Sequence, residues 1–121
     1  MGRMDAQAEV RRRLAEALPG VEVRVTVPDP RPATLVVVRR EGGPLENRLI
    51  DRPGIGVQCW APTEAEASAL AARVSDAMLS LPFSAGFATV EETVMRSDPD
   101  MRSGSPRWYA SYTLRTFKPR V

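Results

Sequence analysis

Residues 62–82, PTEAEASALAARVSDAMLSLP, decide the fold because they encode one long amphipathic helix with a clear beginning and end. Thr63 and Glu66 have the spacing of a capping box, in which the threonine hydroxyl accepts from the glutamate backbone N–H and the glutamate carboxylate reaches back. Pro82 ends the helix, because proline has no backbone N–H to donate. About 19 residues give a helix of roughly 28 Å, long enough to cross several strands. Its buried face is expected to consist of the apolar residues at helical spacing: Ala67, Leu70, Ala71, Val74, Met78 and Leu81.

Three strands are expected before this helix. In Val21–Val27 every second residue is valine, the pattern of a strand with one buried face, and a proline-rich stretch from Pro28 ends it. The second strand, Thr34–Arg40, contains the continuous apolar run Leu35–Val38, which predicts a central strand covered on both faces. Ile55–Trp60 forms the third strand, with alternate residues directed inward.

Two strands, Phe87–Met95 and Arg107–Phe117, are expected after the long helix, and a shorter helix precedes all the strands. The shorter helix takes Asp5 as its N-cap and is expected to bury Val10, Leu14, Ala17 and Leu18. The order α-β-β-β-α-β-β with short connections predicts an α/β (α+β) fold, a mainly antiparallel sheet of about five strands packed against two helices. No linker divides the 121 residues, so residues 1–121 are expected to form a single domain.

The connection formed by residues 41–54 is too polar to enter the core and too long for a simple hairpin turn. It is therefore expected to project from the domain and to act as the main contact with a partner. Its charged and amide side chains are Glu41, Glu46, Asn47, Arg48, Asp51 and Arg52.

The composition argues against catalysis. The chain contains no histidine, which removes the commonest general base and the commonest metal ligand. Its one cysteine, Cys59, is interpreted as an inert core residue, Asp98 and Asp100 as solvated turn residues, and Gly54-Ile55-Gly56 as a turn. We therefore expect no enzyme activity, no cofactor and no metal site.

Charge and hydropathy point to a protein made in the cytoplasm. Seventeen basic and 15 acidic residues give a net charge of +2, without a basic arm that would bind nucleic acid by charge alone. Arg11, Arg12 and Arg13 are interpreted as a solvated helix face, with contact to a partner or to DNA as alternatives. The longest apolar run is too short to span a membrane, and Asp5 and Glu9 stand where a signal peptide would be apolar.

Between Val21 and Phe117 the chain resembles tail terminator proteins of siphophages, also called tail completion or minor tail proteins. The order and spacing of short segments carry the resemblance, since each segment alone is weak. The segments are Arg39-Arg40, Gly42-Gly43, Asp51-Arg52-Pro53, Val57–Trp60, the alanine-rich helix Ala65–Met78, Pro106-Arg107-Trp108 and Leu114-Arg115.

The resemblance implies a structural protein of the virion tail that assembles with itself as a ring, typically a hexamer. Such a ring ends polymerisation of the tail tube and supplies the surface on which head and tail join. The implied partners are the major tail tube protein and a head-tail connector or stopper protein, and DNA is expected only to pass through the ring. The alternatives are another neck protein, such as the connector or stopper itself, a non-viral α/β adaptor domain, or an unrecognised enzyme.

Seven charged residues are candidates for the assembly interface. Two of them lie beside prolines that stiffen the backbone, Asp51 near Pro53 and Arg107 after Pro106. These two are expected to pair with each other, to pair across a subunit boundary, or to be solvated strand-end charges. The full set is Arg39, Arg40, Glu46, Arg48, Asp51, Arg52 and Arg107.

Overall fold

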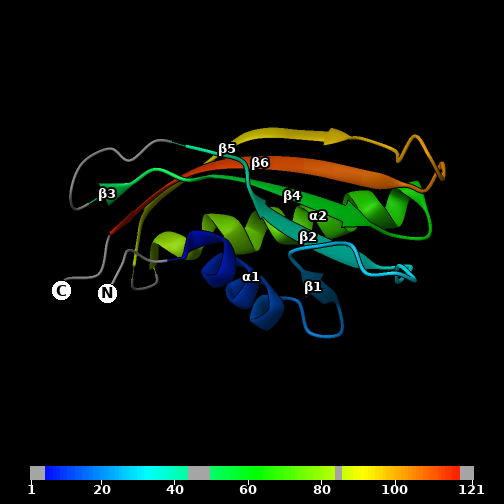
Figure 1. The fold of residues 1–121 in the computed structure, drawn as a ribbon, viewed down its shortest axis with the longest axis horizontal. Helices are drawn as coiled ribbons and strands as arrows, with labels where there is room; N and C mark the ends of the chain where they lie inside the picture. Colours follow the sequence, from blue (N-terminus) through cyan, green and yellow to red (C-terminus); the bar gives the residue numbers. More distant parts are fainter. Residues whose placement is uncertain (1–4, 44–49, 84–85, 118–121) are drawn as a thin grey trace.

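The computed structural model describes residues 5–43, 50–83 and 86–117, which form one twisted sheet with two helices on one of its faces (Figure 1). The elements follow in the order α1 (Ala6–Ala17), β1 (Glu22–Arg24), β2 (Leu35–Arg40), β3 (Ile50–Asp51), β4 (Gly54–Trp60), α2 (Glu64–Leu79), the 3-10 helix η1 (Leu81–Phe83), β5 (Phe87–Ser97) and β6 (Arg107–Phe117). The predicted α+β class and its order of elements are confirmed, with β3 as an additional short strand.

The sheet has the order β1-β2-β4-β6, and β5 pairs with the other edge of β6. All pairs are antiparallel except β1 with β2, which is parallel. β3 and β4 pair with β6 in one continuous register, since Asp51 lies opposite Thr116 and Gly54 lies opposite Thr113. They are therefore two parts of one line along β6, interrupted only at residues 52–53.

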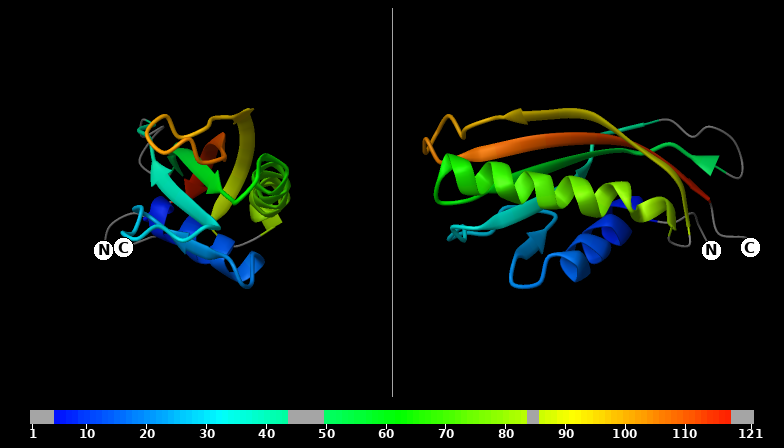
Figure 2. Two further views of the ribbon diagram at one scale, coloured as in Figure 1. Left: turned by 90° about the vertical axis from the view of Figure 1, so that its right-hand side faces the viewer. Right: turned by 180° about the vertical axis from the view of Figure 1, so that it is seen from behind.

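Both helices contribute to the same hydrophobic core. α1 contacts β1 and β2, whereas α2 contacts β4, β5 and β6, so the helices divide one face of the sheet between them (Figure 2). The N-cap prediction for α2 is confirmed at Thr63, whose hydroxyl accepts from the Glu66 backbone N–H at 3.2 Å. Asp5 likewise caps α1 by accepting from the Ala8 N–H at 3.1 Å.

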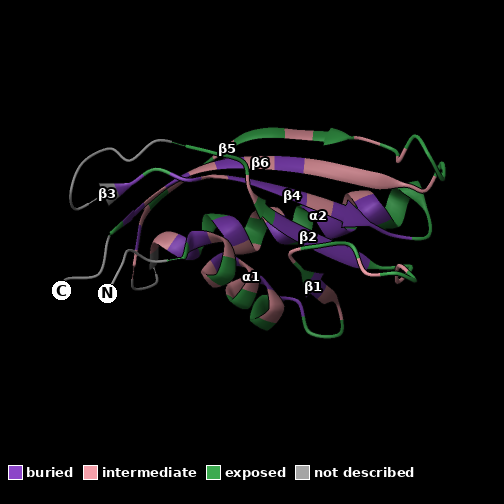
Figure 3. Ribbon diagram, viewed as in Figure 1, coloured by how far each residue is buried: buried purple, intermediate pink, exposed green. Residues whose placement is uncertain are grey.

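β2 is covered on both faces, as its apolar run predicts. All four residues of Leu35–Val38 are buried, and Figure 3 shows β2 and β4 as the most buried strands of the sheet. Val36 and Val38 belong to the core beneath the helices, while Leu35 and Val37 form a small cluster with Trp60. A second apolar layer therefore lies on the face of the sheet that the helices leave open, which we call the open face.

Two predictions of detail are wrong. The first strand has only three residues, and Val27 is 42% exposed, because the chain leaves the sheet before the proline-rich stretch begins. Ala17 is exposed at the end of α1, since Leu18 takes the core position there and Ala6 is buried at the other end.

Candidate assembly surface

Arg40, at the end of β2, and Asp51, in β3, form a two-point salt bridge. The two terminal guanidinium nitrogens lie 2.8 Å and 3.0 Å from the two carboxylate oxygens, the geometry that only arginine provides. Asp51 is 1% exposed, so this carboxylate depends on its partners for the solvation that water would otherwise supply. The hydrogen bond with Asp51 is also the main reason that the pKa of Arg40 is raised.

The same arginine binds the backbone around it. It donates to the carbonyls of Gly42 at 3.1 Å and Gly43 at 2.9 Å, and its own backbone N–H donates to Gln7 of α1 at 2.8 Å. Residues 40–43 and 51–54 are further joined by backbone hydrogen bonds between Glu41 and Gly54 and between Gly54 and Gly42. We call residues 40–43 and 51–54 the base of the 41–54 segment.

These contacts change the interpretation of two candidates. Arg40 and Asp51 hold the base together within one chain, and the burial of Asp51 excludes a solvated strand-end charge. Arg52 is exposed beside them and available to a partner. Glu46 and Arg48 lie outside the described residues.

Arg107 pairs with a different residue at the opposite end of β6. Its Nε donates to the Asp98 carbonyl at 2.8 Å, and a terminal nitrogen lies 3.2 Å from the Asp98 carboxylate. A pair between Arg107 and Asp51 within one chain is therefore wrong, because β6 separates them: Asp51 lies opposite Thr116, and Arg107 opposite Trp60. Asp98, expected as a solvated turn residue, is the partner of Arg107 instead.

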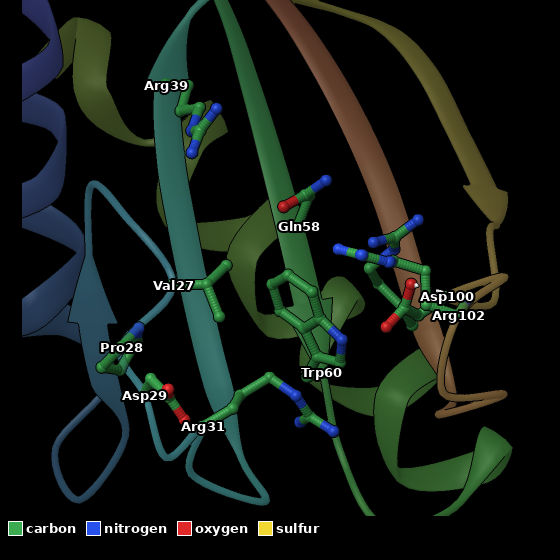
Figure 4. A pocket seen from close by; sticks show the side chains of 10 residues that line it. Val27, Pro28, Asp29, Arg31, Arg39, Gln58, Trp60, Asp100 and Arg102 are labelled. Atoms are coloured by element: carbon green, nitrogen blue, oxygen red, sulfur yellow. Dashed lines mark hydrogen bonds between the residues drawn. The ribbon is translucent and has the colours of Figure 1, made fainter.

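A groove of about 500 Å³ lies on the open face at this end of the sheet, and we call it the cationic groove (Figure 4). One wall is the connection between β1 and β2, the other is the hairpin between β5 and β6, and strands β2, β4 and β6 form the floor. Its lining residues are Val27, Pro28, Asp29, Arg31, Arg39, Gln58, Trp60, Asp100, Arg102 and Arg107.

Trp60 lies on the floor of the groove between two guanidinium groups. The guanidinium carbons of Arg31 and Arg107 are 5.4 Å and 5.2 Å from the centre of its ring, within the range of cation–π attraction. Arg31 is held in place by hydrogen bonds to the Ser105 hydroxyl at 2.8 Å and the Pro32 carbonyl at 3.0 Å. The indole N–H of Trp60 is buried and has no hydrogen-bond partner among the described residues.

Two other arginines of the groove are open to a ligand. Arg39 and Arg102 are exposed, and among the described residues neither guanidinium makes a hydrogen bond or an ion pair. Of these groove residues, the sequence marked Arg39 and Arg107 and missed Arg31, Trp60 and Arg102. No local signal could have found them, because three segments far apart in the chain bring them together.

Glu41 covers the middle of the open face. Its carboxylate accepts a hydrogen bond from the Tyr109 hydroxyl, and a Cβ atom at Gly56 would come within 2.3 Å of it. Gly56 lies within β4, as the strand expected over Ile55–Trp60 predicts, and its lack of a side chain admits the close approach of Glu41. The turn expected at Gly54-Ile55-Gly56 is wrong, because Gly54 already begins β4.

Three further features concern the reactivity of the single cysteine, metal binding and membrane insertion. Burial raises the pKa of the Cys59 thiol to about 12, which keeps it protonated and unreactive. Within residues 5–43, 50–83 and 86–117, no group of three histidine, cysteine, aspartate or glutamate side chains is placed to hold a metal ion. In the same part of the chain, no helix has the length and apolar character needed to cross a membrane.

No protein-family model matches the chain, and no curated protein matches it. One solved structure that matches is a chain of a particle described as "Virion of native gene transfer agent (GTA) particle", with a TM-score of 0.63 and 21% sequence identity. The match covers 94% of this chain and 99% of that chain, so the two share the whole α+β domain and not one motif. At this identity the likeness shows a common fold.

Proposed function

We propose that this protein is a structural component of a phage-like virion, and that it acts as the tail terminator. The observation that carries the proposal is the likeness of the whole domain to a chain of a gene transfer agent virion. The order of short segments that resembles siphophage tail terminators supports the same conclusion independently. The chain would close as a ring of six subunits on the end of the tail tube.

The position of the two polar surfaces supports assembly into a ring. In a cyclic oligomer each subunit offers two different patches to its two neighbours. The base of the 41–54 segment and the cationic groove lie toward opposite ends of β6, because Thr116 lies beside Asp51 and Arg107 beside Trp60. One elongated subunit thus carries two distinct surfaces that are available to separate partners.

The base attaches both ends of the 41–54 segment to the sheet through the hydrogen bonds of Arg40. Arg40 ties residues 42, 43 and 51 to the end of β2, so a contact made by this segment would act on the rigid sheet. In the proposed ring, Arg39, Arg52 and the residues Glu46 and Arg48 of the segment contact a neighbouring subunit, the tube protein or the connector protein. The lack of histidine supports a role without catalysis.

Polymerisation of the tail tube tests this proposal. The major tail tube protein encoded with this chain is allowed to polymerise with and without it, and tube lengths are measured by electron microscopy. We expect the protein to bind one end of each tube and to stop growth, with a mass of six subunits at that end. Tubes that grow equally long in its presence, with no bound protein, would rule out the terminator role.

A further inference from the structure

We propose that the cationic groove binds an extended acidic segment of a partner protein, whose carboxylates pair with Arg39 on one side of the groove and with Arg102 on the other. The assignment of the partner as another virion protein rests on the proposed function. The binding chemistry itself rests on the geometry of the groove.

The groove has hydrogen-bond donors that the described residues leave unused. The Arg39 guanidinium extends from β2 and the Arg102 guanidinium from the β5–β6 hairpin, and both line the groove. In Figure 4 the indole nitrogen of Trp60 lies on the side that carries Asp100 and Arg102. A buried donor without a partner is costly, and an acceptor brought by a ligand would remove that cost.

The fixed arginines give the groove a stable frame. Arg107 is held by Asp98, and Arg31 by Ser105 and Pro32. These two guanidiniums therefore stay packed on Trp60 and are not available to bind a ligand. Arg39 and Arg102 are the two that remain free to form charge-assisted hydrogen bonds, which are stronger than neutral ones.

The charge of the lining favours a carboxylate over nucleic acid. Four arginines and two aspartates give the ten lining residues a formal charge of +2, too little for the dense phosphates of a DNA strand. Asp100 is held by the Ser103 hydroxyl at 2.7 Å and stays in the hairpin, and the exposed Asp29 lies on the opposite wall. A polyphosphate chain along the groove would meet both aspartates, whereas the separate carboxylates of a peptide can pair with Arg39 and Arg102 one at a time.

The remaining lining fits the rest of a peptide. Val27 is 42% exposed and lies with Pro28 on one wall, and Trp60 supplies an apolar floor. The cavity of about 500 Å³ is of the size that binds small ligands and admits a few residues of extended chain. An acidic segment with neighbouring apolar side chains matches both parts of the lining.

Tryptophan fluorescence tests the proposal on the whole chain. Trp108→Phe leaves Trp60 as the only tryptophan, since the sequence contains two. The probe is a hexaglutamate peptide blocked at both ends, and hexaglutamine is the neutral control. The groove variant is Arg39→Gln with Arg102→Gln, and the matched control is Arg24→Gln with Arg73→Gln, which removes two exposed arginines outside the groove and the same charge.

We expect hexaglutamate to change the Trp60 emission, hexaglutamine to leave it unchanged, and the groove variant to bind at least about tenfold more weakly. The control variant should stay within about twofold of the parent protein. Three results would overturn the inference: no emission change, equal weakening in both variants, or tighter binding of a single-stranded DNA 12-mer to the same groove. The oligomeric mass of the same proteins is measured in parallel, so that failure of ring formation is seen separately from failure of peptide binding.

Discussion

The Arg40 guanidinium meets the buried Asp51 carboxylate at 2.8 Å and 3.0 Å, and this pair joins residues 40–43 to residues 51–54, the two stretches that form the base of the 41–54 segment. Eleven residues separate the two in sequence. The contact arises because β3 continues the line of β4 along β6 and returns the chain to the end of β2. Asp51, expected either as an anchor or as a solvated strand-end charge, is thereby a buried anchor.

Arg40→Met should destabilise the fold by about 3 kcal/mol, because it leaves the buried Asp51 carboxylate without its counter-charge. Urea unfolding measures the change as a shift of the midpoint at constant slope. Arg39→Met is the matched control, since Arg39 is adjacent but exposed, and it should change stability by less than about 0.5 kcal/mol. Equal effects of the two variants would show that the Arg40–Asp51 pair does not stabilise the base.

Gly42 and Gly43 form a second matched pair of positions. Both have positive φ, +94° and +95°, so alanine at either position should cost about 1–2 kcal/mol from backbone strain. At Gly43 the new Cβ would also lie 2.1 Å from the Arg52 carbonyl oxygen, whereas at Gly42 nothing lies within 4 Å. Gly43→Ala should therefore be the more destabilising by about 1–3 kcal/mol in the same unfolding experiment. Equal losses of unfolding free energy in the two variants would mean that residues 43 and 52 can separate to admit the new Cβ without destabilising the fold.

Reversing two charges of the 41–54 segment should impair assembly without unfolding the subunit. Arg52 is exposed, and such substitutions usually change stability by no more than about 0.5 kcal/mol. We expect Arg48→Glu with Arg52→Glu to keep the thermal midpoint but to reduce binding to tube ends. Unchanged binding to tube ends would remove this segment from the interface.

Stability should fall at alkaline pH because of Cys59. The folded protein keeps the thiol proton up to a pKa of about 12, while the unfolded chain loses it near its usual value of 9.0. Unfolding thus releases a proton above pH 9, and the free energy of unfolding should decrease by about 1.4 kcal/mol per pH unit from this residue. Below pH 9 the thiol is neutral in both states and contributes no pH dependence.

Urea unfolding at pH 9 to 10 isolates the cysteine. Burial also raises the pKa values of Tyr109 and Tyr112, but tyrosine begins to contribute only near its ordinary pKa of 10.0. Cys59→Ala should therefore remove most of the slope in this interval. An unchanged slope in the variant would mean that another group releases the proton.

Local patterns predicted much of the fold. The Thr63 cap, the apolar spacing of α2 and the four apolar residues of β2 depend on neighbours in sequence, and the structure confirms all three. The parallel pairing of β1 with β2 was not predicted, since it depends on how the proline-rich connection crosses the sheet.

The sites were harder to predict because they depend on distant contacts. Sixteen of the 17 basic residues are arginine, so no single arginine stands out from the solvated background. Arg31, Trp60 and Arg102 come together only when the β1–β2 connection and the β5–β6 hairpin are placed on either side of β4. Asp51 was singled out for its neighbouring proline, but its contact with Arg40 depends on how β2, β3 and β4 are aligned in the sheet.

The central claim is that this protein occupies the end of the tail tube, and its location on particles made without heads tests this most directly. In one preparation tails are assembled in the absence of the capsid protein, in a second heads are assembled in the absence of the tail tube protein, and in both this chain is marked with a gold label for electron microscopy. The account predicts one cluster of label at one end of each free tail. Label found on heads that lack tails, and absent from free tails, would contradict it and would assign the protein to the head side of the joint.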